Sequence, residues 1–475
     1  KRGILEKNPY LASTLISMYA KCGALAKAEE VLDMLPFRDI VSWNALIGGF
    51  ATQGHNYEAM NCFDRMQTEG FSPDAITFSC ILKACGSARA IEKGKQIHDE
   101  IASRGWLKKD VVLGNALIVM YVKCSLLAKA QQVLEDLPVR NAISWSALIA
   151  GYAQHQEAHQ ALKCFERMQS EGFFPDAITF TCILKACGTC RAIDKGKEIH
   201  DEIVSRRFLE SDVVLGNALV DMYCKCGMLT KAQQVLEELP MRNASSWSAL
   251  IIGYTQHGQG HKALNCFERM QSEGLSPDTV TFICILKACG SIGAFEKGKQ
   301  VHDKIRDANL LKQDIVLGTA LVDMYAKCGL VAKAEQVLEE LPLQNVVSWS
   351  VVIGGYAQQG QGREALNCFG RLQREGVFPD VVTFTCVLKA CGSIGAIDKG
   401  KQIHNEIMSR GLLEKDIMLG TGLVDMYAKC GALAKARDVL KELPHRDVIA
   451  WNALISGYAQ QGLGPEALSC FEEMR

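Results

Sequence analysis

Residues 42–74 read SWNALIGGFATQGHNYEAMNCFDRMQTEGFSPD, and the pattern in this stretch decides the fold. Its second half repeats apolar residues at the i, i+4, i+7 spacing of one helix face, as in Ala59, Phe63 and Met66. A break at Gly54 separates that face from an earlier amphipathic run, and the glycine and proline of EGFSPD end the second run. The stretch therefore predicts a hairpin of two helices.

Five tryptophans that are spaced 102 residues apart mark a long repeat along the chain. Each 102-residue block divides into three related units of 35, 36 and 31 residues, the first set being 40–74, 75–110 and 111–141. Every unit has the two-helix pattern, and strand signals are absent. Each of these tryptophans lies in a similar local sequence, such as SWNALIGGF at the first and AWNALISGY at the last. They are Trp43, Trp145, Trp247, Trp349 and Trp451.

A single helical hairpin cannot bury both of its faces, so neighbouring hairpins have to stack on one another. The predicted fold is all-α, an α-solenoid superhelix of stacked helix-turn-helix repeats that forms one tract over residues 1–475. Residues 1–8 match the end of a unit, and the chain stops at Arg475 inside another unit. We therefore expect it to be part of a longer protein.

The overall composition excludes several classes of protein. Hydrophobic residues make up 48% of the chain, and no run approaches the roughly 20 apolar residues of a membrane helix, so no membrane partner is expected. The 52 basic and 53 acidic residues nearly cancel, so a nucleic-acid partner would have to meet a local basic stripe. The 20 cysteines occupy fixed places in the repeat, which indicates buried packing residues in a reducing compartment rather than disulfides.

The alternating units, with text such as SWSVVIGGYAQQGQGREALNCFGRLQREGVFPD at 348–380, resemble the P, L and S motifs of plant pentatricopeptide repeat (PPR) proteins of the PLS class. The resemblance covers essentially the whole chain. Tetratricopeptide repeats also form helical hairpins, but their fixed period of about 34 residues and their Trp-Leu-Gly-Tyr pattern do not fit this sequence. The resemblance implies S motifs at 9–39, 111–141, 213–243, 315–345 and 417–447, P motifs at 40–74, 142–176, 244–278, 346–380 and 448–475 (truncated), and L motifs at 75–110, 177–212, 279–314 and 381–416, with 1–8 as the end of a preceding L motif.

By the same resemblance, the fifth and the last residue of a motif together face one base of a single-stranded RNA. The last residue has a second interpretation, because an Asp or Asn there would equally serve as the N-cap of the next helix. The fifth residue favours base reading, since it changes among Asn, Ser and Thr while its neighbours scarcely vary between repeats. The implied pairs are Ser13 with Asp39, Asn44 with Asp74, Asn115 with Asn141, Ser146 with Asp176, Asn217 with Asn243, Ser248 with Asp278, Thr319 with Asn345, Ser350 with Asp380 and Thr421 with Asp447, and Asn452 has no partner within the chain.

These pairs present different donors and acceptors to a base edge. The resemblance implies that Asn with Asp favours uracil, Ser or Thr with Asp guanine, Thr with Asn adenine, and Asn with Asn a pyrimidine. The predicted ligand, written 5′ to 3′ with n for an L motif, is G-U-n-Y-G-n-Y-G-n-A-G-n-G. The L motifs depart from the code, most clearly at Ile283, which cannot hydrogen-bond a base; their fifth residues are Ser79, Thr181, Ile283 and Thr385.

Two further sets of residues complete the implied interface. The second residue of a motif would wedge between bases, unless it packs within the first turn of its helix; Ser245 departs from the aliphatic pattern of Val41, Val112, Ile143, Val214, Val316, Val347 and Ile449. A lysine eight residues after the fifth residue of each S motif would meet phosphate, although a lysine near a helix C-terminus also compensates the helix dipole. These lysines are Lys21, Lys123, Lys225, Lys327 and Lys429.

No catalytic or metal-binding residue is predicted. GAFEKGK at 293–299 resembles the start of a P-loop, but Gln300 stands where a Ser or Thr must bind magnesium. The His-x-Glu at 98–100 lacks the downstream Pro-Cys-x-x-Cys that a zinc-dependent deaminase needs. We therefore expect neither a cofactor nor a metal.

The sequence thus predicts a non-catalytic tract that binds single-stranded RNA sequence-specifically, one base per repeat. The P-L-S order resembles organelle factors for C-to-U RNA editing, in which a deaminase domain or an editing co-factor protein supplies the chemistry. A mitochondrial or chloroplast location is implied, with the targeting peptide outside this chain. A transcript-stabilising or splicing factor and a protein-interaction scaffold are the alternatives.

Overall fold

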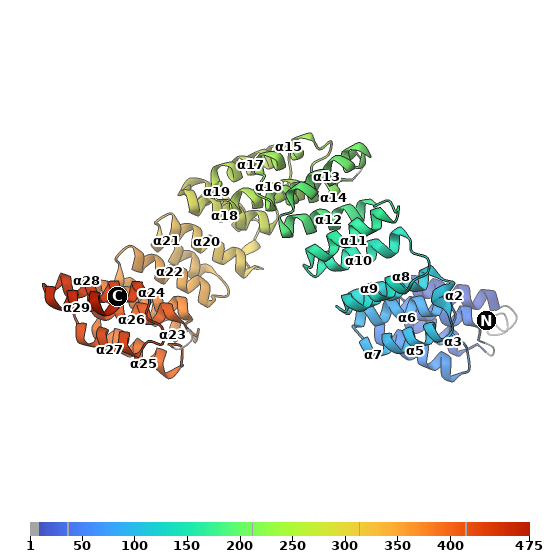
Figure 1. Ribbon diagram of the computed structural model, residues 1–475, viewed down its shortest axis with the longest axis horizontal. Helices are drawn as coiled ribbons and strands as arrows, with labels where there is room; N and C mark the ends of the chain where they lie inside the picture. Colours follow the sequence, from blue (N-terminus) through green and yellow to red (C-terminus); the bar gives the residue numbers. More distant parts are fainter. Residues whose placement is uncertain (1–8, 36–37, 211, 313, 414–415) are drawn as a thin grey trace. The chain divides into compact units, whose positions relative to one another are not determined.

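The computed structural model describes residues 9–35, 38–210, 212–312, 314–413 and 416–475 (Figure 1). Every regular element in these ranges is a helix. Two compact bodies make up the chain, Lys1–Arg242 and Asn243–Arg475. Within each body the helices form stacked hairpins, so the predicted all-α solenoid fold is confirmed.

In the first body, each repeat contributes a first and a second helix, and the two complete L motifs add a short 3-10 turn. The elements are α2 (Pro9–Lys21), α3 (Leu25–Asp33), α4 (Ile40–Gln53), α5 (Asn56–Thr68), α6 (Ala75–Ala88), α7 (Ile91–Ser103), η1 (Trp106–Lys108), α8 (Val111–Lys123), α9 (Leu127–Asp136), α10 (Ala142–Gln154), α11 (Ala158–Ser170), α12 (Ala177–Cys190), α13 (Ile193–Ser205), η2 (Phe208–Glu210), α14 (Val213–Lys225) and α15 (Leu229–Glu238).

The second body continues the same order of paired helices. Its elements are α16 (Ala244–Gln256), α17 (Gly260–Ser272), α18 (Thr279–Ile292), α19 (Phe295–Asp307), η3 (Leu310–Lys312), α20 (Ile315–Lys327), α21 (Val331–Glu340), α22 (Val346–Gln358), α23 (Gly362–Arg374), α24 (Val381–Ile394), α25 (Ile397–Ser409), α26 (Ile417–Lys429), α27 (Leu433–Glu442), α28 (Val448–Gln460) and α29 (Gly464–Met474). None of the described helices is long and apolar enough to cross a membrane.

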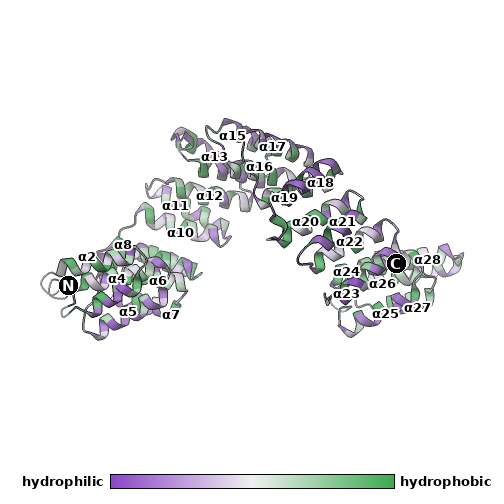
Figure 2. Ribbon diagram, turned by 180° about the vertical axis from the view of Figure 1, so that it is seen from behind, coloured by the Kyte–Doolittle hydropathy of each residue, from purple (hydrophilic) through white to green (hydrophobic). Residues whose placement is uncertain are grey.

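The helices pack in two layers within each body. First helices of successive repeats pack directly on one another, as α4 does on α6 and α6 on α8. Each second helix packs on the first helix of its own repeat and on that of the next, as α5 does on α4 and α6. Figure 2 shows hydrophobic and hydrophilic residues alternating along these ribbons, as expected of helices that each bury one side. The first-helix layer therefore presents one continuous face, formed by the starts of its helices.

The repeated tryptophan anchors the core of each P motif. Trp247 is fully buried, and the guanidinium of Arg269 on the second helix lies 5.1 Å from its ring centroid. The indole Nε1 donates a hydrogen bond of 2.7 Å to Glu273. A cation over an indole is attracted by the ring quadrupole, so this contact fastens the two helices of the hairpin together. Arg371 lies over Trp349 in the same way, at 5.4 Å.

The glycine of the P-loop-like sequence is a packing residue. Gly298 is buried in α19, and a Cβ atom there would lie 2.5 Å from the sulfur of Met324 on α20. Such a distance is far below van der Waals contact, so a larger residue here would force the Met324 side chain to move, and glycine allows the methionine to pack where it does. The spacing that resembles a phosphate-binding loop arises from helix packing.

All 20 cysteines are free thiols, and most are buried or half-buried. Burial raises the pKa of Cys289 to about 12, and it does the same for Cys391. Buried thiols of this kind remain protonated and inert. The interpretation of the cysteines as packing residues therefore agrees with their burial in the structure.

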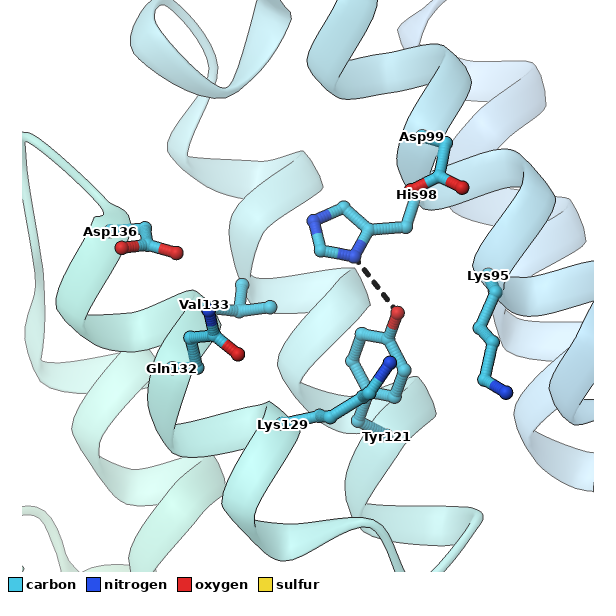
Figure 3. Close-up of a pocket in the computed structure, with 8 residues that line it drawn as sticks. All are labelled: Lys95, His98, Asp99, Tyr121, Lys129, Gln132, Val133 and Asp136. Carbon is cyan, nitrogen blue, oxygen red and sulfur yellow. Dashed lines mark hydrogen bonds between the residues drawn. The ribbon is translucent and has the colours of Figure 1, made fainter.

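A histidine on the second helix of each L motif bonds to a tyrosine of the next repeat. In Figure 3 the ring of His98 on α7 points toward the hydroxyl of Tyr121 on α8, with Nδ1 and Oη 2.8 Å apart. Lys129 and Asp136 of α9 line the same surface pocket of about 250 Å³. Burial lowers the pKa of His98 and outweighs the opposing negative charge of Asp99, while the positive charge of Lys129 adds to the lowering. The histidines are helix-packing residues, which gives the His-x-Glu sequences a structural explanation.

Stability is expected to fall on mild acidification. The pKa values of His98, His200, His302 and His404 are all below the ordinary value of 6.5, chiefly because of burial. The unfolded chain therefore takes up protons at higher pH than the folded chain, so this stability is complete above pH 6.5 and is lost as the pH falls through the lowered values. Thermal melting between pH 7.5 and 5 should show the loss, and replacement of the four histidines by glutamine should make it shallower. An equal loss in that variant would contradict the assignment.

Candidate functional site

The last residue of each P or S motif caps the first helix of the next motif. Asp278 shows the geometry: its Oδ1 accepts a hydrogen bond of 2.8 Å from the backbone amide of Thr281. Capping by the last residue, the second interpretation left open by the sequence, is thus present, and it satisfies an amide that the helix itself cannot pair. The same cap is formed by Asp39, Asp74, Asn141, Asp176, Asn243, Asn345, Asp380 and Asp447.

Capping occupies only part of each side chain. At Asp380 the backbone amide and the hydroxyl of Thr383 both bond to Oδ1, at 2.8 and 2.7 Å. Within the described ranges, Oδ2 of Asp380 has no hydrogen-bond partner. A carboxylate has about four acceptor sites, so the capping residue can still accept a hydrogen bond from a ligand.

The structure brings the fifth and last residues of several motifs into contact, although they are 26 or 30 positions apart. The amide of Asn44 donates to Asp74 Oδ1 and Oδ2 at 3.0 and 3.1 Å. The amide of Asn115 donates to Asn141 Oδ1 at 3.4 Å. The amide of Asn345 donates to Thr319 at 3.4 Å, and the hydroxyl of Thr421 donates to Asp447 at 3.2 Å. Asn217 belongs to the first body and Asn243 to the second.

Hydrogen bonds also determine the charge of the acidic member of the pair in the first P motif. Burial by itself raises the pKa of Asp74, but hydrogen bonds from Thr77 and Asn44 outweigh it and hold that pKa below its ordinary value of 3.8. Asp74 is therefore a carboxylate at neutral pH, which accepts hydrogen bonds and donates none.

Serine pairs are arranged differently. Ser248 and Asp278 are joined through a third side chain, Thr281, the third residue of the following motif. The Ser248 and Thr281 hydroxyl oxygens are 2.6 Å apart, and Thr281 donates to Asp278 Oδ1 at 2.6 Å. Sequence reasoning missed this residue, although the Asp-x-x-Thr spacing of a capped helix was visible at 278–281.

Burial differs between the two members of a pair. The fifth residues Ser13, Asn44, Ser248 and Ser350 are each at most 9% exposed, whereas the last residues are half-buried or exposed. In these four motifs the fifth residue therefore forms the floor of the site, and a ligand would meet the last residue first. The other fifth residues are half-buried, except for the exposed Asn452.

Exposed aliphatic side chains flank these polar pairs. The second residues predicted to contact bases are 51% to 64% exposed, so any packing within the first turn leaves about half or more of each side chain accessible. Such side chains stand out because large apolar residues are usually buried. Sequence reasoning did not include their counterparts in the L motifs, which are similarly exposed: Ile76, Ile178, Val280 and Val382.

The predicted phosphate lysines are not equivalent. Lys225, Lys327 and Lys429 form ion pairs of 2.7, 2.8 and 2.7 Å with the aspartate four residues earlier on the same helix. Lys123 instead donates to Ser87 at 3.2 Å, and Lys21 is exposed. The aspartates reduce the positive charge of this stripe, although exposed ion pairs of this kind contribute only about 0–1 kcal/mol each and are easily exchanged.

A second set of lysines, which sequence reasoning missed, lies on the first helices of the L motifs. Each is exposed and stands one helical turn after the fifth residue, on the same helix face. No ion pair of these lysines occurs within the described ranges. The repeated ILK or VLK of the L motif is the sequence pattern that could have identified these lysines. They are Lys83, Lys185, Lys287 and Lys389.

The described residues contain no group of three His, Cys, Asp or Glu side chains placed to hold a metal ion.

Comparison with known sequences identifies the family. The model described as "PPR repeat family" matches residues 38–87, 140–189, 242–291 and 344–393, and that described as "PPR repeat" matches 11–40, 217–243, 319–346, 382–412 and 449–475. A chloroplastic pentatricopeptide repeat-containing protein of Arabidopsis thaliana is 32% identical over 467 residues, which cover 98% of this chain and 75% of that protein. The chain belongs to the pentatricopeptide repeat family.

Other PPR relatives cover nearly all of the chain. DOT4, a chloroplastic protein of Arabidopsis thaliana, is 36% identical over 99% of this chain and 54% of its own length. A mitochondrial relative from the same plant is 33% identical over 98% of this chain and 60% of its own length. The chain therefore spans about half to three quarters of the length of these PPR proteins. Their chloroplastic and mitochondrial designations agree with the expected organelle location.

The solved structures show the same fold. The crystal structure of the maize pentatricopeptide repeat protein PPR10 matches 97% of this chain and 78% of its own, with a TM-score of 0.62 and 19% identity. PPR10 in complex with an 18-nt psaJ RNA element matches 98% of this chain with a TM-score of 0.54 and 17% identity.

Capping and ligand chemistry can be separated at the last residue of a PPR motif. Replacing Asp380 by alanine should lower the free energy of unfolding by about 1 kcal/mol, because the amide of Thr383 loses its acceptor. Asparagine caps as well as aspartate, so Asp380→Asn should change stability by less than about 0.5 kcal/mol. Denaturant unfolding of both variants measures the difference. If asparagine and alanine destabilised the protein equally, the cap itself would need a carboxylate, and capping could not be separated from ligand binding at this residue.

Proposed function

We propose that this chain binds single-stranded RNA sequence-specifically, one base per P or S motif, on the face formed by the first helices. The main support for the proposal lies at the starts of α6, α10, α22 and α28. There an exposed aliphatic second residue stands beside a hydrogen-bonded pair of polar residues that are distant in sequence. Aliphatic side chains provide a surface for base rings, and the polar pair provides donors and acceptors for one base edge.

The pairs then select bases by the chemistry of their free atoms. Asn44 presents an amide donor beside the acceptors of Asp74, which suits the single donor and two acceptors of uracil. Serine with aspartate presents two acceptors to guanine, whose edge carries two neighbouring donors. We propose the register G-U-n-Y-G-n-Y-G-n-A-G-n-G for the motif boundaries given above, read as one binding tract.

We further propose that the chain is the specificity tract of a PLS-class factor for C-to-U RNA editing in a mitochondrion or chloroplast. The alternation of 35-, 36- and 31-residue repeats supports the class. In this role the tract is not catalytic, and a deaminase domain or an editing co-factor protein acts on a cytidine beside the bound sequence. Stabilisation or splicing of a transcript is the competing role within RNA binding.

A scaffold for proteins is the competing function outside RNA binding. The row of exposed aliphatic side chains supports it, because apolar rows also bind peptides. RNA binding with a base preference and a steep salt dependence separates the two functions.

Base reading is tested at the motif that holds Thr319 and Asn345. In a fluorescence-polarisation titration, an RNA of the predicted register should bind more tightly than one with the corresponding adenine changed to guanine. Asn345→Asp should reverse the preference while keeping the helix cap. A discrimination of about tenfold is expected, since one good pairing contributes about 1–3 kcal/mol. Equal binding of both RNAs, or no binding, would favour the scaffold.

Phosphate binding is tested at the L-motif lysines. Replacing Lys83, Lys185, Lys287 and Lys389 by glutamine should make the slope of log K against log salt shallower by up to about 2.8, at about 0.7 for each phosphate whose lysine is replaced. The matched control replaces four lysines of the same motifs on the second helices, namely Lys95, Lys197, Lys299 and Lys401. A similar change in the control would attribute the effect to net charge rather than to direct binding of the RNA backbone.

A further inference from the structure

The third residue of a motif carries a hydroxyl buried beneath the proposed base site. These hydroxyl residues are at most 1% exposed, which is unusual for polar side chains. A buried hydroxyl requires partners, and here the partners are the two base-reading residues of the preceding motif or the capping backbone. The set comprises Ser42, Thr77, Ser144, Thr179, Ser246, Thr281, Ser348 and Thr383.

The hydroxyl orients the amide of an asparagine at the fifth position. Thr77 donates to Asn44 Oδ1 at 2.6 Å, with Asp74 Oδ1 2.9 Å away. Because the amide oxygen is held by the hydroxyl, the amide nitrogen turns to the last residue. Ser144 holds Asn115 in the same orientation, with a bond of 2.5 Å to its Oδ1.

The hydroxyl also determines whether a serine at the fifth position can accept a hydrogen bond from a ligand. Thr281 donates its only hydroxyl proton to Asp278, so the Thr281 oxygen can only accept from Ser248. The proton of Ser248 can then go to Thr281 or to the carbonyl of Ala244, which is 2.8 Å away. In either case the oxygen of Ser248 keeps a lone pair for a ligand. Ser146 with Thr179 and Ser350 with Thr383 repeat the arrangement, at 2.6 and 2.7 Å.

Positions without the hydroxyl have a different geometry. After each L motif the third residue is a leucine, and the aspartate at the end of the L motif accepts from the second amide. Asp314, for example, accepts from Val316 at 2.8 Å and also from Leu317 at 3.0 Å. Ile283, the fifth residue of that L motif, has no hydroxyl or amide to be joined. After the last S motif the third residue is Ala450, and Thr421 bonds directly to Asp447.

We propose that the hydroxyl of the third residue of the following motif is a positioning residue for base recognition, a third determinant beside the fifth and last residues. Beside Asn44, Asn115 and Ser248 it holds the pair in one hydrogen-bonding state, so the atoms facing the base are defined before the RNA arrives. Beside Thr319 the hydroxyl of Ser348 bonds instead to the backbone carbonyl of Asn345. Its replacement by leucine explains why the L motifs depart from the code. The inference rests on the proposed RNA binding and deepens it.

Thr281→Val tests the inference, because valine has the shape of threonine and leaves the backbone cap from Asp278 in place. Fluorescence polarisation compares RNAs with guanine or adenine opposite Ser248 and Asp278, for the wild type, Thr281→Val and Thr281→Ser. We expect the wild type to prefer guanine about tenfold, the valine variant to prefer it less than about twofold, and serine to restore the preference. A purely structural role would instead weaken both RNAs equally and lower the melting temperature.

A reciprocal variant keeps the test decisive if valine impairs folding. Ala450→Ser places, at the third position after the last S motif, the residue found at that position after the four other S motifs, and it should increase the preference for guanine opposite Thr421 and Asp447. An unchanged preference in both variants, with a selective wild type, overturns this inference alone. A wild type that binds RNA without preference, or does not bind it, overturns the proposed function and this inference together.

Discussion

The N-cap at the junction between repeats is the constraint on which the site depends. A first helix begins with amides that no preceding turn can pair, and the side chain just before the helix has to accept from them. Asp278 does so for α18, and the requirement recurs at each junction. At Asp74 the cap places Oδ1 against the helix, and both carboxylate oxygens also accept from Asn44, the fifth residue of the same motif. A residue needed for folding thereby becomes half of a potential recognition pair, and the repeat length sets the distance between successive pairs.

Packing of the hairpins keeps this geometry uniform. Buried tryptophans such as Trp247 and Trp349, covered by arginines of the second helix, hold the two helices of each P motif together. The close approach at Gly298 brings α19 against α20. Because the first helices stack directly on one another, their exposed second residues follow one after another along the face of each body. The face itself has buried polar side chains beneath it and exposed aliphatic side chains at its rim.

Much of this was predictable from the sequence. Helical periodicity and the 102-residue repeat led to the hairpins, and the Asp or Asn at each repeat end indicated both a cap and a base reader. Three features were not predicted, for physical reasons. The contact between Ser248 and Thr281 joins residues 33 apart, so it depends on how neighbouring helices pack. The ion pair of Lys327 with Asp323 obeys helical spacing but competes with other partners that only the fold excludes. The L-motif lysines follow the fifth residue at helical spacing, but only the fold shows that they are exposed and that they form no ion pair among the described residues.

The paired residues are proposed to read a defined order of bases. Selection of bound sequences from a pool of random single-stranded RNA tests this proposal most directly, since no register is assumed beforehand. We expect enrichment of G-U-n-Y-G-n-Y-G-n-A-G-n-G, with the adenine moving to guanine when Asn345 is replaced by aspartate and with little preference at n. Enrichment of an unrelated sequence, or a pool that stays random while RNA is bound, would contradict base reading by these pairs.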